Sequence, residues 1–184
     1  MTLRDDARDV LTRWSAPDVE QERLRSLYLE HVERHDDALS RECHPDHLTT
    51  SALIVSADHT QVLLTLHRRL QRWLQTGGHC EPSDASLVHA AAREGREESG
   101  IDDLAVDPVP VLLSRHEVPG CGPVRPSHHL DVQYVAVAPE GAREVISDES
   151  DELGWFGFDD LPGSVDQSVR DLIAAATRRL REIP

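Results

Sequence analysis

The segment AREGREESGI, residues 92–101, places three glutamates within one turn of a predicted helix: Glu94, Glu97 and Glu98. Side chains three or four residues apart share one face of a helix, so all three carboxylates can reach one point in space. Their mutual repulsion costs roughly a few tenths of a kcal/mol for each exposed pair. A divalent cation that prefers oxygen ligands, Mg²⁺ or Mn²⁺, would convert this repulsion into binding. The alternative is a solvated acidic face on which Arg93 pairs with its neighbours.

A glycine-rich stretch precedes this helix. The glycine pair at 77–78 is predicted to end a hairpin and to allow a tight backbone approach, and HCEPSD follows as a short loop. We expect the helix to span residues 85–99, with Ser83 or Asp84 as its N-cap and Gly100 as its C-terminal stop. The chain is therefore expected to bring a close-packed backbone segment beside the acidic helix.

The remaining periodicities predict an α+β fold. Two β-like runs, TTSALIVSA and QVLLTLH, are separated by DHT, which indicates a hairpin with Asp58 in its turn. Further strands are predicted at VPVLLSRHEV, LDVQYVAVAP and LGWFGF, and a last amphipathic helix at residues 165–180. Antiparallel hairpins mixed with separate helices favour a sheet sandwiched between helices over a regular βαβ winding.

Residues 1–46 are predicted to form a helical extension that precedes the main domain, residues 47–184. Apolar residues recur there at helical spacing, and Pro17 separates two helices. The second helix carries an apolar stripe formed by Leu24, Leu27, Tyr28 and Val32. Such a stripe needs a partner surface. The sequence is compatible with two partners, the chain's own domain or a second subunit in a homodimer.

Composition excludes several classes of protein. The formal net charge of −15 argues against a nucleic-acid or anionic-membrane binder, because both need a basic face. No run approaches the roughly 18 to 20 apolar residues of a membrane helix. Cys43, Cys80 and Cys121 are odd in number and lack a C-x-x-C spacing, so they are predicted to be free thiols in a reducing compartment. These features predict a cytoplasmic protein.

From the second glycine of the pair onward, the sequence resembles the signature of the Nudix hydrolase superfamily. In that signature a glycine, a loop and an acidic helix form a metal site. The matching residues here are Gly78, Arg93, Glu94, Glu97, Glu98, Gly100 and Ile101. Asp84 stands near the family's first helix-side glutamate. The resemblance extends over residues 48–162 and implies a Nudix-type α/β/α sandwich with a mixed sheet in residues 47–184.

The resemblance also implies an activity, the metal-dependent hydrolysis of a pyrophosphate bond in a nucleoside diphosphate linked to another group. The substrate class is then a small nucleotide: a nucleotide sugar, a dinucleotide or a nucleoside triphosphate. Glu94, Glu97 and Glu98 would hold Mg²⁺ or Mn²⁺, and Glu97 and Glu98 would be catalytic. Arg93 would fix these glutamates in place, a catalytic role implied by its spacing from Glu97.

Residues outside the signature complete the implied site. Glu149 matches an acidic residue that can serve related enzymes as base or extra metal ligand, and Glu152 is the second choice. Arg68 and Arg69 lie shortly before the glycine pair and would offset the negative charge of the chain near the phosphates. These residues make up the expected substrate side of the site, together with Gly78.

His79 directly follows the glycine pair, so we expect its side chain to face the phosphate or metal site. A phosphate contact is the favoured role, a metal site shared with His47 is an alternative, and an uninvolved loop histidine is the third. Two other functions remain open for the chain. One is a nucleotide-binding or sensing module without turnover, and the other is a diphosphate isomerase. Gly77 occupies the position of the isomerases' cysteine, which argues against the latter.

Overall fold

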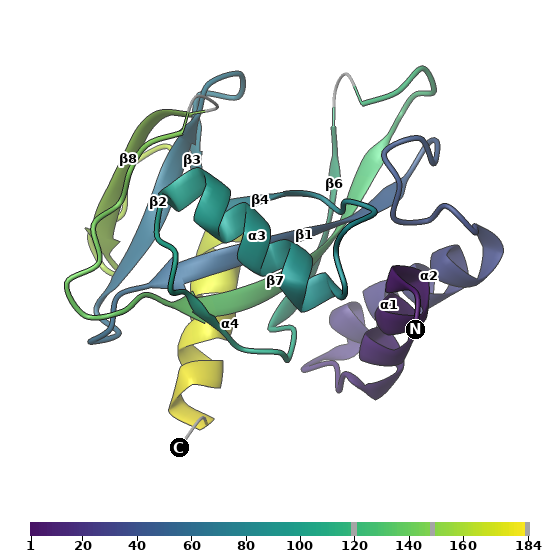
Figure 1. The fold of residues 1–184 in the computed structure, drawn as a ribbon, viewed down its shortest axis with the longest axis horizontal. Helices are drawn as coiled ribbons and strands as arrows, with labels where there is room; N and C mark the ends of the chain where they lie inside the picture. Colours follow the sequence, from purple (N-terminus) through teal and green to yellow (C-terminus); the bar gives the residue numbers. More distant parts are fainter. Residues whose placement is uncertain (119–120, 148–149, 183–184) are drawn as a thin grey trace.

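The structure is a computed structural model that describes residues 1–118, 121–147 and 150–182 (Figure 1). In chain order its elements are α1 (Leu3–Arg13), α2 (Val19–Arg34), β1 (His47–Val55), β2 (Gln61–His67), β3 (Arg72–Leu74), β4 (Thr76–His79), α3 (Leu87–Ser99), β5 (Ala105–Val106), β6 (Leu112–Glu117), β7 (His128–Val137), β8 (Ser150–Gly157) and α4 (Gln167–Glu182). Helices and strands are interspersed along the chain, as the sequence predicts. No helix among the described residues is both long enough and apolar enough to span a bilayer.

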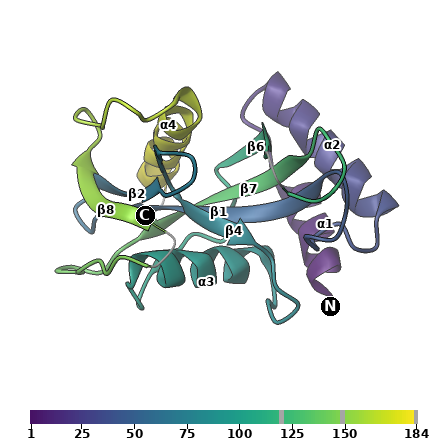
Figure 2. The same ribbon diagram turned by 90° about the horizontal axis from the view of Figure 1, so that it is seen from above.

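The strands form one mixed sheet with β1 at its centre. β1 pairs antiparallel with β2 and β4 and parallel with β7, and every residue of β1 is buried. β3 and β8 extend the sheet beyond β2, while β5 and β6 pair with β7. α3 covers one face and α4 covers the opposite face (Figure 2). The predicted α+β sandwich with a mixed sheet is confirmed.

Alternation along β1 assigns its side chains to these two faces. Leu48, Ala52 and Ile54 belong to the apolar core shared with α1, α2 and α3. Leu53 and Val55 belong to a second core that packs on α4. Because successive residues of a strand point to opposite faces, the odd-numbered residues of β1 share the α4 side.

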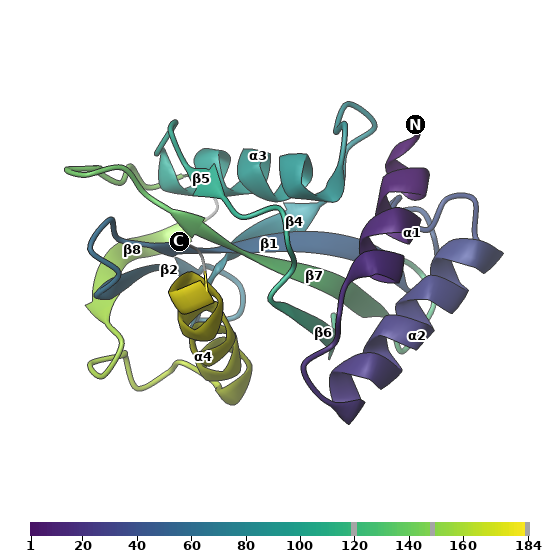
Figure 3. The same cartoon turned by 90° about the horizontal axis from the view of Figure 1, so that it is seen from below.

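The N-terminal extension packs as two helices at one end of the sheet (Figure 3). Tyr28 and Val32 are buried in the same core as the sheet residues. The side-chain amide of Gln21 donates to the carbonyl of Leu113 at 3.0 Å and accepts from the N–H of Leu113 at 2.7 Å. Through this residue α2 therefore provides hydrogen-bond partners for the backbone of Leu113 in β6. The expected helices are therefore packed on their own domain, while the boundary at residue 46 stays a prediction.

The N-cap predicted for the acidic helix is wrong by two or three residues. Ser86 caps α3 by accepting the backbone N–H of His89, whereas Ser83 and Asp84 were expected in that role. The carboxylate of Asp84 is instead occupied by Arg93 and by the backbone N–H of Glu81. The C-terminal stop at Gly100 is confirmed, because its φ of 68° lies in the left-handed region that favours glycine.

The glycine pair lies inside strand β4 and does not end a hairpin. Gly77 pairs with Ser51 and Gly78 with Thr50. A Cβ at Gly77 would fall 2.4 Å from Cβ of Ser51, and one at Gly78 would fall 2.7 Å from the carboxylate of Glu94. Glycine is therefore required by close packing on both faces of this edge strand. Strands β3 and β5 are the other elements that the sequence pattern did not indicate, because each has three residues or fewer.

Candidate metal and phosphate site

Arg93 organises the acidic end of α3 from a largely buried position, with 14% of its side chain exposed. Its Nε and Nη2 atoms donate to the two carboxylate oxygens of Asp84 at 3.1 and 3.0 Å. Burial disfavours the carboxylate of Asp84, but hydrogen bonds from Arg93 and the Glu81 N–H outweigh burial, so the pKa of Asp84 lies below its ordinary value. The hydrogen bonds that Arg93 donates to Asp84 and to Glu94 raise the pKa of Arg93. This pair fixes the arginine in one orientation.

The other donors of Arg93 reach two glutamates and the adjoining strand. Nη1 donates to Glu94 at 2.9 Å and to Glu97 at 3.0 Å, which confirms the pairing expected from their spacing. Nη2 also donates to the backbone carbonyl of His79 at 2.9 Å. One guanidinium therefore links the acidic helix to the end of β4.

Two of the glutamates also contact the glycine pair directly. Glu98 accepts the backbone N–H of Gly77 at 2.8 Å, and the carboxylate of Glu94 occupies the space that a Cβ on Gly78 would fill. Glu97 is more open, with 59% of its side chain exposed. We call Glu94, Glu97 and Glu98 the carboxylate cluster. The atoms that its side chains offer to a metal are all carboxylate oxygens. Mg²⁺ and Mn²⁺ prefer oxygen ligands, so these residues fit the expected cation.

A buried polar network lies on the α4 side of the same strands. Asp131 of β7 accepts hydrogen bonds from Ser51 at 2.7 Å, from Gln133 at 3.0 Å and from Thr49 at 3.1 Å. Only 3% of Asp131 is exposed. The sequence analysis did not identify this network. Polar residues inside the otherwise apolar runs TTSALIV and LDVQYVAV were the available signal, and they become meaningful only once β1 and β7 are known to pair in register.

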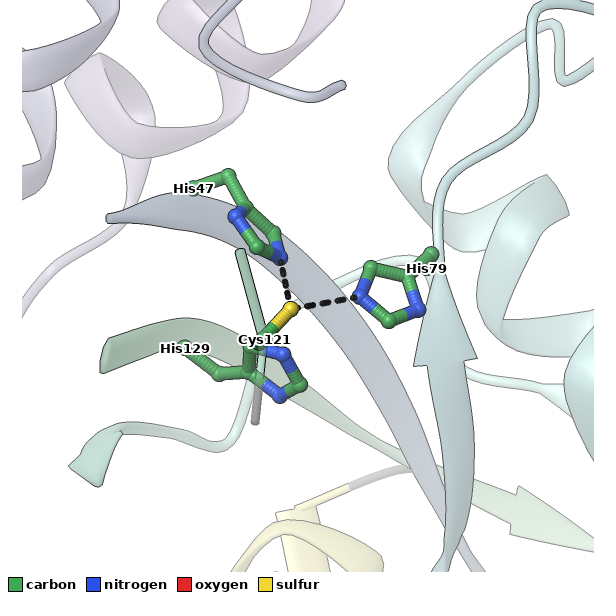
Figure 4. Close-up of side chains that lie close together, drawn as sticks. All are labelled: His47, His79, Cys121 and His129. Carbon is green, nitrogen blue, oxygen red and sulfur yellow. Dashed lines mark hydrogen bonds between the residues drawn. The ribbon is translucent and has the colours of Figure 1, made fainter. Parts of the chain in front are cut away.

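Histidines from three strands meet at the end of this polar face (Figure 4). His47 of β1 lies opposite His129 of β7, and His79 of β4 follows Gly78 on the other side of β1. Cys121, from the connection between β6 and β7, completes the group. We call His47, His79, Cys121 and His129 the histidine–cysteine cluster. The expected proximity of His47 and His79 is thus observed, with ring centroids 5.1 Å apart.

The remaining expected site residues lie elsewhere or outside the described residues. Arg68 donates to Asp151 and to the carbonyl of Ser150 in β8, and Arg69 is exposed in the turn after β2. Glu152 is exposed on β8. Glu149 lies outside the described residues. Among the contacts of the described residues, none joins Arg68 or Arg69 to the carboxylate cluster.

The fold and site together define a class of protein: a mixed sheet between helices, with an acidic helix held against a glycine-bearing strand by one arginine. A family model described as NUDIX domain matches residues 45–176. The chain belongs to the NUDIX family, which confirms the resemblance of its signature segment. No curated protein matches the chain.

Solved structures of this family share the fold. A NUDIX-family hydrolase from Clostridium perfringens is 23% identical with a TM-score of 0.58, covering 75% of this chain and 98% of that one. A MutT NUDIX hydrolase from Burkholderia pseudomallei is 25% identical with a TM-score of 0.55, over 71% and 97% of the two chains. The NUDIX domain of NrtR from Shewanella oneidensis, complexed with ADP ribose, is 19% identical with a TM-score of 0.59, over 82% and 97%.

Proposed function

We propose that this chain is a pyrophosphohydrolase that uses Mg²⁺ or Mn²⁺. Its substrate would be a nucleoside diphosphate linked to another group, in the form of a nucleotide sugar, a dinucleotide or a nucleoside triphosphate. One observation carries the proposal: Glu94 and Glu98 are held against the two glycines of β4, while Arg93 contacts Glu94 and Glu97. Family membership supports the same reaction class.

A bound divalent cation would neutralise pyrophosphate oxygens and lower the pKa of a coordinated water. Glu94, Glu97 and Glu98 would hold it. Arg93 keeps Glu94 and Glu97 oriented, and its own direction is fixed by the pair with Asp84. Glu98 receives its orientation from the N–H of Gly77. These contacts orient the carboxylates, which lowers the entropic cost of binding a cation.

The proton acceptor in this proposal is Glu149, with Glu152 as the second choice. This choice rests on the resemblance of the segment before Trp155 to the family's closing segment. A phosphate contact by Arg68 stays a proposal from the sequence, because in the structure this side chain pairs with Asp151 and with the carbonyl of Ser150.

A substrate screen tests the proposal. Nucleotide sugars, dinucleotides, nucleoside triphosphates and coenzyme A would each be incubated with the full chain and Mg²⁺, and hydrolysis products would be resolved by chromatography. Hydrolysis that requires Mg²⁺ and is lost in Glu98→Gln supports the assignment. Glu20→Gln on exposed α2 is the matched control, because it removes one carboxylate far from α3. Metal-independent hydrolysis, or hydrolysis that survives in Glu98→Gln, contradicts it.

A nucleotide sensor without turnover is the second candidate. The NUDIX domain of NrtR was solved with ADP ribose bound, and this chain shares its fold. Saturable nucleotide binding by the wild-type chain with no product in the screen would favour the sensor. An isomerase gains no support, because the position of the expected thiol is Gly77, whose Cβ position is filled by Ser51.

A further inference from the structure

The histidine–cysteine cluster is assembled from four separate segments of the chain. His47, His79 and His129 come from β1, β4 and β7, and Cys121 comes from the connection between β6 and β7. One potential ligand atom from each residue lies within 4.8 Å of all the others. Figure 4 shows the three imidazoles surrounding the sulfur. The pyrophosphohydrolase proposed above assigns no step to these side chains, and the phosphate contact expected of His79 is the competing role.

The distances within the cluster suit one small cation. Sγ of Cys121 lies 3.7 Å from Nε2 of His47 and 3.8 Å from Nε2 of His79. Tetrahedral Zn²⁺ with nitrogen and sulfur ligands places neighbouring ligand atoms about 3.3–3.6 Å apart. The ring centroid of His129 lies 5.0 Å from that of His47 and 4.9 Å from that of His79. The third imidazole is therefore about as close to the other two as they are to each other. The two sulfur–nitrogen distances exceed the tetrahedral range by only a few tenths of an ångström, and the four ligand atoms as a set lie within 4.8 Å of one another.

Hydrogen bonding leaves ring nitrogens available as ligands. Nδ1 of His47 lies 3.2 Å from the carbonyl oxygen of Cys43. A carbonyl only accepts, so Nδ1 carries the proton and the lone pair of Nε2 points toward Cys121. A backbone carbonyl orienting the second nitrogen in this way is typical of metal-binding histidines. Nε2 of His129 is buried and has no hydrogen-bond partner among the described residues.

The three imidazoles are neutral at physiological pH. Burial, reinforced by the neighbouring imidazoles and Arg41, lowers the pKa of His79 to about 4 and that of His129 to about 3. Burial also lowers the pKa of His47. Neutral imidazole is the form that binds metals. A cation bound by Nε2 of His129 would satisfy this buried polar atom, which is costly to leave unpaired.

Two neighbouring residues define how the cluster is built. Gly122 follows Cys121 with a φ of 78°, and a Cβ there would collide with the imidazole of His44, so the turn that presents the sulfur is closely packed. Arg41 lies 3.5 Å from Nδ1 of His79, at the outer limit of a hydrogen bond. Its side chain is exposed and can turn away when Nδ1 of His79 carries the proton.

We propose that His47, His79, His129 and Cys121 bind a Zn²⁺ ion in a site separate from the carboxylate cluster. Three imidazole nitrogens and one thiolate are ligands that select zinc over the oxygen-preferring Mg²⁺. Four protein ligands close the coordination sphere, which is typical of a structural site. The ion fastens the β6–β7 connection across β1, β4 and β7. This assignment selects the metal alternative for His79 over a phosphate contact.

Metal analysis of the full chain tests the site without any substrate. After purification without chelator, mass spectrometry of the metals should find roughly one zinc ion per chain. Replacing zinc with Co²⁺ should give the intense visible absorption of tetrahedral cobalt and a sulfur-to-cobalt charge-transfer band in the near ultraviolet. Wild-type protein that binds neither Zn²⁺ nor Co²⁺, or a cobalt complex without the charge-transfer band, overturns the proposal.

Variants identify the ligands. Cys121→Ser should abolish the charge-transfer band, and His47→Ala and His129→Ala should each weaken zinc affinity more than about a hundredfold, beyond the roughly 10- to 100-fold loss typical of a supporting residue. His116→Ala is the matched control, because its ring contacts His129 at 5.5 Å from outside the cluster.

Cys43→Ser tests a second group formed by His35, Asp37 and Cys43. Loss of the band in Cys43→Ser with retention in Cys121→Ser would overturn the assignment. Because the readout is metal content, failure here leaves the pyrophosphohydrolase proposal standing.

Discussion

The carboxylate cluster and the histidine–cysteine cluster lie on opposite sides of the same short strand, and they differ in how the chain builds them. Gly78 of β4 faces α3 and admits the carboxylate of Glu94, while the next residue, His79, faces the other side and joins the imidazoles. The first cluster comes from one helical turn of sequence. The second comes from four segments, the most distant of which are separated by 82 residues. Two adjacent residues therefore contribute to two chemically distinct sites.

The two clusters also differ in charge. The carboxylate cluster is anionic, with Glu94 and Glu97 joined by the buried guanidinium of Arg93 and Glu98 held by the N–H of Gly77. The imidazoles of the histidine–cysteine cluster are neutral and are brought together by strand register. Hard oxygen ligands on one side and nitrogen with sulfur on the other would let one domain separate Mg²⁺ from Zn²⁺ by ligand type. The predictions below separate the two sites experimentally.

The largest effect is expected at the carboxylate cluster. On a substrate found by the screen, Glu98→Gln should lower kcat about a hundredfold or more and change KM much less, because charge stabilisation acts in the transition state. Glu97→Gln should behave in the same way. Steady-state kinetics at saturating Mg²⁺ measure both constants, and thermal unfolding should show little change in either variant. Wild-type turnover in one of them would show that its carboxylate is not part of the metal site.

Alanine substitutions at the two glycines of β4 should affect stability and activity differently. Gly77→Ala places a Cβ 2.4 Å from Cβ of Ser51 and 2.7 Å from the carbonyl oxygen of Thr50, so the strands must move apart. We expect a loss of about 1–3 kcal/mol in the free energy of unfolding. Gly78→Ala meets the movable carboxylate of Glu94 instead, so turnover should fall more than stability. Denaturant unfolding and kinetics on both variants provide the check, and equal effects on both quantities would contradict this division.

The pair of Asp84 and Arg93 should contribute stability that depends on pH. The pKa of Asp84 is lowered in the folded state, so its stabilisation is present at neutral pH and disappears as pH falls through the folded-state pKa. Asp84→Asn should cost about 1–3 kcal/mol at neutral pH, since the buried arginine loses a charged partner. The free energy of unfolding of wild type and of Asp84→Asn would be measured from pH 7 downward to below the ordinary pKa of Asp, about 3.9. The two free energies should converge in acid. A difference that persists unchanged in acid would assign the effect to packing.

The contrast between the clusters explains what the sequence could and could not predict. The spacing of Arg93, Glu94 and Glu97 was readable because helical periodicity converts sequence distance directly into position. β2 was predicted with its observed bounds, because a β-like run follows the turn at Asp58. The site formed by His129 and Cys121 was not predictable, because it depends on β1 and β7 pairing in parallel, with the chain returning from far along the sequence. The cap at Ser86 was missed because the side chain of Asp84, the expected cap, accepts a hydrogen bond from Arg93, nine residues later in the chain.

The smallest effect should be that of the zinc site on the proposed hydrolysis. Cys121 contacts His47 and His79, and among the described residues His79 is hydrogen-bonded to the acidic helix through its backbone carbonyl, which accepts from Arg93. Loss of zinc in Cys121→Ser therefore loosens the β6–β7 connection without removing any oxygen ligand from the carboxylate cluster. We expect kcat to fall by less than about tenfold, well below the loss expected for removal of a catalytic group. The comparison is kinetic, with wild type, Cys121→Ser and His116→Ala assayed at saturating Mg²⁺. A loss in Cys121→Ser as large as that in Glu98→Gln would show that the two clusters act as a single catalytic centre.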